Sequence, residues 1–291
     1  MELWFWFAVA GAVIGGAPSF IMKIAAQRKY NAELFIFSSA ALTCIVMLPI
    51  AAWKGTAGIN WTILAIVTAG GMLSSLGGIF RINALKHIDT TIYYPLVKLL
   101  SPALAIAFGI VFFAESFTKI EWIGLMSGLL VPLLLITRAE EGRQNNLFKG
   151  LVLVAFTGFL SAIIAAINKY GADIYGDVIW LLAGTSFGVL VGAFLFIVYK
   201  QGLSNFYSHV KNDTSKDMMY LASSRGVLIL VSFGCILYAY SIGGTLAIVH
   251  TIHSLYILIP IVLSIIFYNE HWNIRKIVAV ILSVTALAMF G

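Results

Sequence analysis

Glu115-Ser116-Phe117-Thr118-Lys119-Ile120-Glu121-Trp122 ends one apolar segment and begins the next, and a counterpart, Glu270-His271-Trp272-Asn273-Ile274-Arg275-Lys276, recurs 155 positions later. With the same offset, residues 83–118 align on residues 238–273 without a gap. Identical pairs in this alignment include Ala84 and Ala239, Thr90 and Thr245, Phe112 and Phe267, and Glu115 and Glu270. Repetition on this scale predicts a fold built from two copies of one unit.

The composition is far more apolar than that of a soluble domain. Of the 291 residues, 61% are hydrophobic and only 10% are charged, and the mean hydropathy is +0.98. Crossing about 30 Å of hydrocarbon takes roughly 20 helical residues. Apolar stretches of about this length are residues 3–25, 32–53, 60–85, 91–113, 120–137, 147–168, 177–199, 221–242, 246–268 and 273–290. We therefore expect an all-α membrane protein with ten transmembrane helices.

These stretches divide into two halves of five, residues 1–146 and residues 147–291. Because five is odd, the second half must enter the membrane from the side opposite to the first, and the two repeats are predicted to be inverted. In transporters with inverted repeats, the substrate binds near the bilayer midplane where the repeats meet. Alternating access then comes from rocking the repeats around that site.

The net charge of +6 is carried mainly by connections and helix ends, which indicates membrane topology rather than nucleic-acid binding. Most Lys and Arg residues fall in the connections after the first, third, fifth, seventh and ninth stretches. The positive-inside rule places these connections in the cytoplasm and both termini outside. The segment from Lys200 to Tyr220 is expected to be a polar loop, with a short amphipathic surface segment as the alternative. Cys44 and Cys235 lack metal-binding spacing, so no metal site or cofactor is expected.

Several motifs resemble those of a known family. Ala84-Leu85-Lys86-His87-Ile88-Asp89, a Pro-containing apolar helix, Glu115 and Trp122-Ile123-Gly124 look like the EamA-type repeat of the drug/metabolite transporter superfamily. The region from Tyr238 to Phe290 looks like its second copy. The resemblance implies a transporter, not an enzyme, in a bacterial or archaeal inner membrane. Family members carry amino acids, nucleotide sugars, phosphorylated sugars, choline, nucleobases or drugs, and generally have both termini in the cytoplasm, which conflicts with the charge pattern.

Lys98 is the ionisable residue that lies deepest within an apolar stretch. It is seven residues into its stretch, about 10 Å below the helix start, and a charge at that depth needs a cavity or a partner. The repeat aligns Lys98 with His253. Because the copies are inverted, the two side chains should enter from opposite faces and flank the midplane, which makes both of them candidate substrate-binding residues.

Three more residues share helical faces with this pair. His250 lies three positions before His253, Tyr256 three positions after it, and Tyr94 four positions before Lys98. This arrangement resembles that of phosphate translocators of the same superfamily, in which basic residues on the fourth and ninth helices hold a phosphate. The alternative is structural: Lys98 is neutral or pairs with a carbonyl freed by a nearby proline, and the histidines bond between helices.

The remaining charges also bear on the solute. Lys23, Arg81 and Lys169 lie near predicted helix ends, where their charges can reach the interface or act at a gate. All twelve acidic residues fall in loops or at helix ends, so the interior is expected to be positive or neutral. This favours a small solute with a carboxylate or phosphate, either an anion or a zwitterion such as an amino acid. Proton coupling through His250 and His253, uniport and exchange of solutes all stay open.

Two other functions are considered. One is export of aromatic or cationic drug-like compounds through a cage of Tyr93, Tyr94, Tyr238 and Tyr256. The other is a membrane enzyme or an assembly protein. No catalytic set is apparent, since Ser254 beside His253 cannot form a nucleophile-base pair: adjacent helical residues point apart.

Overall fold

The chain is described by a computed structural model over residues 2–56, 59–88, 90–135, 147–259 and 274–291. The described residues form helices and no strand, which confirms the all-α prediction. The helices are α1 (Leu3–Gln27), α2 (Ala32–Lys54), α3 (Trp61–Leu85), α4 (Thr90–Phe113), α5 (Lys119–Leu135), α6 (Leu147–Tyr175), α7 (Val178–Gln201), α8 (Phe206–Asp213), α9 (Lys216–Ser241), α10 (Leu246–Ser254), the 3-10 turn η1 (Leu255–Ile257) and α12 (Ile274–Phe290).

Within the described residues, seven helices are long and apolar enough to cross a bilayer: α1, α2, α3, α4, α6, α7 and α9. The helices α5, α10 and α12 are shorter, at 17, 9 and 17 residues. Each predicted apolar stretch contains one of these helices. The count of ten transmembrane helices stays a prediction, because the predicted stretches 120–137, 246–268 and 273–290 each extend into residues outside the described ranges.

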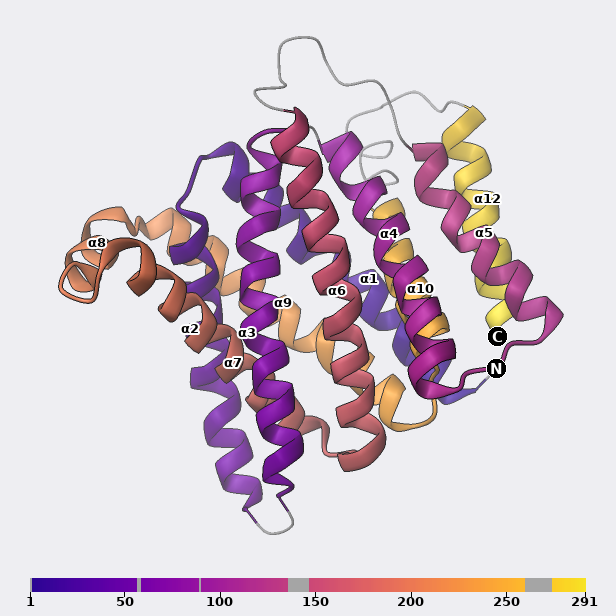
Figure 1. The fold of residues 1–291 in the computed structure, drawn as a ribbon, viewed down its shortest axis with the longest axis horizontal. Coiled ribbons are helices and arrows are strands. Elements are labelled where there is room, and N and C mark those ends of the chain that lie inside the picture. The colour runs from indigo at the N-terminus through magenta and orange to yellow at the C-terminus, as the bar shows by residue number, and fades with distance from the viewer. Residues whose placement is uncertain (1, 57–58, 89, 136–146, 260–273) are drawn as a thin grey trace.

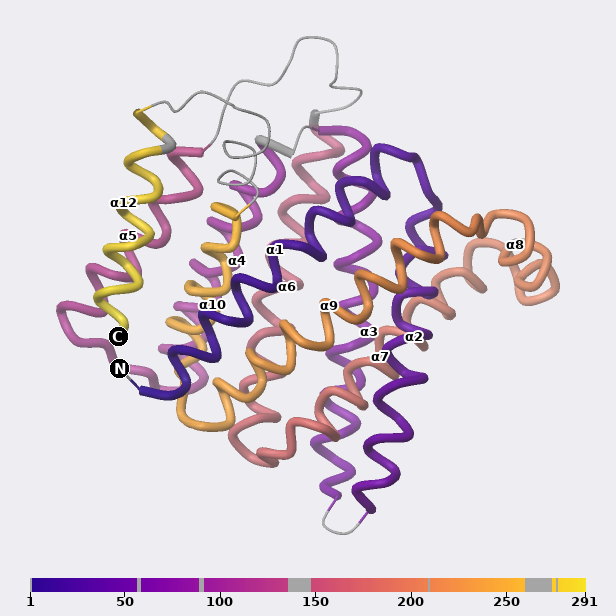
Figure 2. Tube along the Cα trace, turned by 180° about the vertical axis from the view of Figure 1, so that it is seen from behind, coloured from indigo at the N-terminus to yellow at the C-terminus, as the bar shows by residue number. Residues whose placement is uncertain are grey.

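The helices pack into a bundle in which elements distant in sequence are neighbours (Figure 1). In that view, α9 and α10 join at the lower end of the bundle, as do α6 and α7. The helix α1 packs against α9 and α10, and α6 packs against α3 and α4. Figure 2 shows from behind that α5 and α12 lie side by side, and α5 also packs against α4.

Glycines allow α3 and α7 to approach closely. A Cβ atom on Gly71 would lie 2.3 Å from the carbonyl oxygen of Thr185, and one on Gly188 would lie 2.0 Å from that of Thr68. Any larger side chain would therefore force these helices apart. Close backbone packing of this kind is the usual role of small residues between membrane helices.

The connections before α9 and after α6 differ from the sequence predictions. The segment between Lys200 and Tyr220, expected to be a polar loop or a short amphipathic segment, contains the short helix α8. Its Phe206 packs edge-to-face on Phe37 and Phe194, with ring centroids 5.6 Å and 5.1 Å apart. The helix α9 begins at Lys216 instead of residue 221, because the Ser215 side chain caps it by accepting a hydrogen bond from the Met218 N–H. The helix α6 runs to Tyr175 instead of ending at residue 168.

Glu115 lies between α4 and α5, as the repeat predicts, and it has a specific contact across the bundle. Its carboxylate accepts hydrogen bonds from the N–H groups of Leu246 (2.5 Å) and Ala247 (3.2 Å) in the first turn of α10. A negative charge is favourable at this end of a helix. Burial nevertheless raises the pKa of Glu115 above its ordinary value. Its repeat partner Glu270 lies outside the described residues.

Candidate functional site

A central cavity of about 240 Å³ lies among the long helices and contains most of the predicted site residues. Lys98, from α4, lines it and is only 6% exposed. The Lys98 Nζ lies 3.9 Å from the centre of the Tyr256 ring, in the position of a cation-π contact. No carboxylate in the described part of the chain forms an ion pair with Lys98.

His250 and His253, both from α10, line the same cavity but differ in their bonding. His250 is buried, and its Nε2 lies 2.7 Å from the hydroxyl of Ser101 on α4. His253 has no hydrogen bond within the described residues, and its ring stacks edge-on to Tyr256 at 5.3 Å. The ring fits because Gly15 lacks a side chain: a Cβ there would lie 3.1 Å from the His253 Nε2.

The two predicted tyrosines meet at Ser19 of α1. The Ser19 hydroxyl donates to the Tyr256 hydroxyl, and the Tyr94 hydroxyl donates to the Ser19 carbonyl, each at 2.7 Å. Tyr256 lines the cavity, whereas Tyr94 does not. Lys98, His253 and Tyr256 thus lie together in the cavity lining, whereas Tyr94 lies outside it and links α4 to α1. Their role in substrate binding stays a prediction.

Of the three residues near predicted helix ends, only Arg81 lies in the cavity wall. The Arg81 side chain does not reach toward the membrane interface, as its predicted position near a helix end allowed, but lies beside Tyr93 and Met22. Its Nη1 lies 3.7 Å from the Met22 Sδ, and its Nε is buried without a hydrogen-bond partner. Lys169 lies outside the cavity lining and pairs with Asp173 one turn along α6, at 2.5 Å. Lys23 also lies outside the cavity lining.

Arg225 also lines the cavity, although it is not among the site residues predicted from the sequence. Its Nη1 donates to the Ser39 hydroxyl on α2 at 2.8 Å, and its Nε is buried without a partner. The predicted start of its helix at residue 221 placed Arg225 in the first turn. Because α9 begins at Lys216, Arg225 lies more than two turns inside the helix. The N-cap at Ser215 is the signal in the sequence that could have revealed this.

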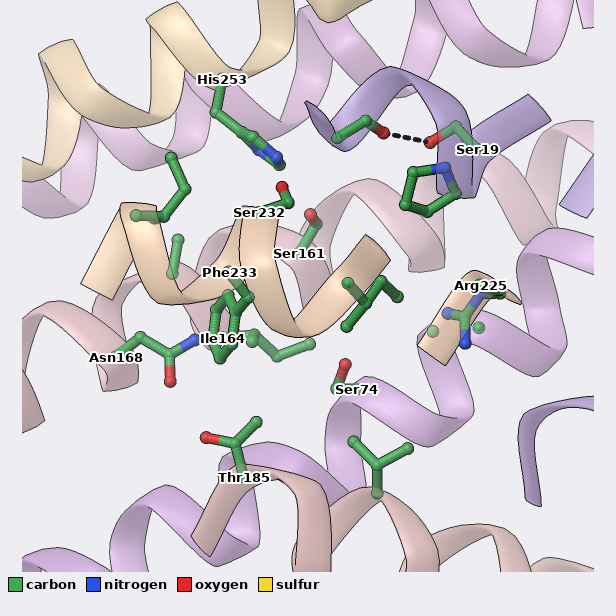
Figure 3. A pocket seen from close by; sticks show the side chains of 18 of the residues that line it. Ser19, Ser74, Ser161, Ile164, Asn168, Thr185, Arg225, Ser232, Phe233 and His253 are labelled. Carbon is green, nitrogen blue, oxygen red and sulfur yellow. Dashed lines mark hydrogen bonds between the residues drawn. The ribbon is translucent and has the colours of Figure 1, made fainter. Parts of the chain in front are cut away.

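The lining of the cavity is therefore cationic. Arg81, Lys98 and Arg225 all line it, and no Asp or Glu is among its described lining residues. Figure 3 shows Arg225 and His253 on different sides of this space. Ion pairs in the described part of the chain lie elsewhere, at Arg28–Asp217, Lys54–Asp177, Lys169–Asp173 and Lys200–Glu33. The described residues also contain no cluster of metal-ligating side chains.

A helical bundle with seven helices long and apolar enough to span a bilayer, counted over the described residues, has the architecture of an integral membrane protein. Residues 2–137 match the model of the EamA-like transporter family. This match places residues 2–137 in the drug/metabolite transporter superfamily.

Comparison with other proteins adds information on the fold alone. A solved structure described only as the crystal structure of a protein has a TM-score of 0.67 to this chain at 15% sequence identity. That match covers 97% of this chain and 96% of the other. No curated protein matches the chain.

Proposed function

We propose that the protein is a secondary transporter of a small carboxylate- or phosphate-bearing metabolite, which binds in the central cavity. The observation that carries the proposal is the set of three cationic side chains, Arg81, Lys98 and Arg225, around a cavity whose described lining contains no acidic residue. Enclosed charges are unfavourable in a membrane protein unless something compensates them. A bound anion supplies the missing negative charge.

The donor geometry also suits an oxyanion. A guanidinium presents five N–H donors in a planar fork that matches carboxylate and phosphate. In the described structure the Arg225 fork donates to the Ser39 hydroxyl, the Arg81 fork lies beside Tyr93 and the Met22 sulfur, and the Nε of each arginine is buried without a partner. Most of the donor capacity in the cavity is thus free for a solute.

The size and charge of the cavity argue against export of drug-like cations. Pockets for drug-sized ligands occupy roughly 300–1,000 Å³, and this cavity occupies about 240 Å³. The proposed tyrosine cage is also not assembled around it. Tyr93 and Tyr94 do not line the cavity, and Tyr238 packs on Phe7 with ring centroids 4.5 Å apart.

We propose further that residues 1–146 and 147–291 are inverted repeats that move relative to each other. If the halves are exchanged by a two-fold axis, the α1–α9 contact corresponds to α6–α3, and α4–α6 corresponds to α10–α1. All four of these helix–helix contacts are present in the structure. Lys98 and His253, which the repeat aligns, both line the cavity between the halves. These observations support alternating access around the cavity.

The test is anion binding and uptake by the purified full-length protein, with Lys98→Met compared with Lys23→Met. Both substitutions remove one positive charge from the bundle, but only Lys98 lines the cavity. We expect small organic phosphates and carboxylates to raise the melting temperature and to be taken up into liposomes. Lys98→Met should weaken binding roughly tenfold or more, the value of one charged hydrogen bond, and Lys23→Met should not. Stabilisation by quaternary amines alone, unchanged in Lys98→Met, would contradict the proposal.

A further inference from the structure

The cavity has a second, uncharged wall that is distinct from its cations. This neutral wall is formed by side chains from three helices: Ser74 of α3, Ser161 and Asn168 of α6, and Thr185 and Ser186 of α7. None of these five makes a side-chain hydrogen bond within the described part of the chain. Asn168, Thr185 and Ser186 are at most 7% exposed.

The serine and threonine hydroxyls elsewhere in the described cavity lining are already bonded within the protein. The Thr43 hydroxyl donates to the carbonyl of Ala40, that of Thr157 to Leu153, and that of Ser232 to Gly11. Buried polar groups in proteins are almost always hydrogen-bonded. The unbonded serine, threonine and asparagine side chains of the described lining therefore lie in the neutral wall, where they are available to a ligand.

The neutral wall is continuous with the cationic residues. Ser74 and Arg81 lie seven residues apart on α3, which is a rise of about 10 Å along the helix. Figure 3 shows Ser74, Ser161, Asn168 and Thr185 around the same space as Arg225 and His253. A solute that extends about 10 Å could thus contact cations at one end and the neutral wall at the other.

The position of Thr185 is set by backbone packing. Its carbonyl would lie 2.3 Å from a Cβ on Gly71, so α3 and α7 are in direct contact at this level. A hydrogen-bonding group held on rigid backbone can select between ligands, because an unsuitable ligand leaves it unpaired.

We propose that the neutral wall binds an uncharged, hydroxyl-bearing part of the solute whose anionic group is held by Arg81, Lys98 and Arg225. This inference rests on the proposed function. Serine, threonine and asparagine side chains both donate and accept hydrogen bonds, as hydroxyl groups do. The solute class is therefore a hydroxylated organic anion, such as a polyol phosphate or a hydroxycarboxylate. An amino acid is disfavoured, since the described lining holds three cations and no carboxylate for its ammonium group.

Two pairs of ligands that differ by hydroxyl groups test the inference: glycerol 3-phosphate with propyl phosphate, and malate with succinate. Apparent affinities are measured by thermal shift on the purified full-length protein. We expect the wild-type protein to prefer the hydroxylated member by roughly two- to tenfold for each hydroxyl bound. Thr185→Val removes a hydroxyl of the neutral wall with little change of shape and should reduce this preference. Thr43→Val is the matched control, because its hydroxyl is already bonded to Ala40, and it should keep the preference.

Ser161→Ala and Asn168→Leu are independent variants of the same wall, and either one replaces Thr185→Val if that protein does not fold. If the preference for the hydroxylated ligand is absent in the wild type, or is unchanged in the wall variants while Lys98→Met still abolishes binding, the inference is wrong and the proposed function stands. If none of the four anions shows Lys98-dependent binding, the proposed function itself is overturned, and this inference with it.

Discussion

Replacing Arg225 by Met should make the ligand-free protein more stable and the anion complex weaker. The two effects are expected to be opposite because Arg225 is poorly satisfied on its own. Its Nη1 has one hydrogen bond, to Ser39, and its Nε is buried without a partner. Arg81 and Lys98 line the same cavity, so all three positive charges share one space.

The sizes of both effects can be estimated. A buried donor without a partner costs about 1–3 kcal/mol, and the hydrogen bond lost to Ser39 is worth about 1 kcal/mol. Arg225→Met should therefore stabilise the ligand-free protein by up to about 2 kcal/mol, or a few degrees in melting temperature. A charged hydrogen bond to the anion is worth about 1.5–3 kcal/mol, so the dissociation constant should rise by roughly 10- to 150-fold.

Thermal unfolding of the purified protein, with and without glycerol 3-phosphate, measures both quantities in one experiment. Arg28→Met is the control, because Arg28 is exposed and pairs with Asp217 at 3.6 Å, away from the cavity. It should leave the anion affinity unchanged. A lower melting temperature for ligand-free Arg225→Met, together with unchanged anion affinity, would show that Arg225 has a structural role and refute the reasoning.

Three further predictions concern other parts of the fold. Burial raises the pKa of Glu115 in the folded protein, so its contribution to stability should fall as the pH rises above 4.5. Glu115→Gln should flatten this part of the profile of stability against pH, and an unchanged profile would contradict the shift. Gly77→Leu should leave the protein folded, since no atom lies within 4 Å of a Cβ there, but it should block uptake because Gly77 lines the cavity. Gly71→Leu should unfold the protein, because α3 and α7 touch at that position. Normal uptake by Gly77→Leu would refute the role of the cavity. Phe206→Ser should loosen α8 by about 1–3 kcal/mol, since two aromatic pairs are lost, and faster proteolysis near Lys211 would measure it; wild-type resistance would mean that α8 is held by other contacts.

The helical fold and part of the site could be predicted from the sequence because both depend on local patterns. Apolar stretches of membrane length locate the helices whatever their neighbours are. The offset between Glu115 and Glu270 aligns Lys98 with His253, and both line the cavity. Helix ends were predicted less well: the cap at Ser215 moves the start of α9 and with it the depth of Arg225.

By itself, the sequence determined that the chain forms apolar helices, that it is internally repeated and that Lys98 lies deep in one helix. Only the tertiary structure decided that Arg81 and Arg225 join Lys98, and that unbonded side chains such as Asn168 and Thr185 form a neutral wall beside them. The physical reason is that hydropathy and helical periodicity act along the chain. Which faces of α3, α6, α7 and α9 meet depends on close contacts between distant segments, such as Gly71 against Thr185.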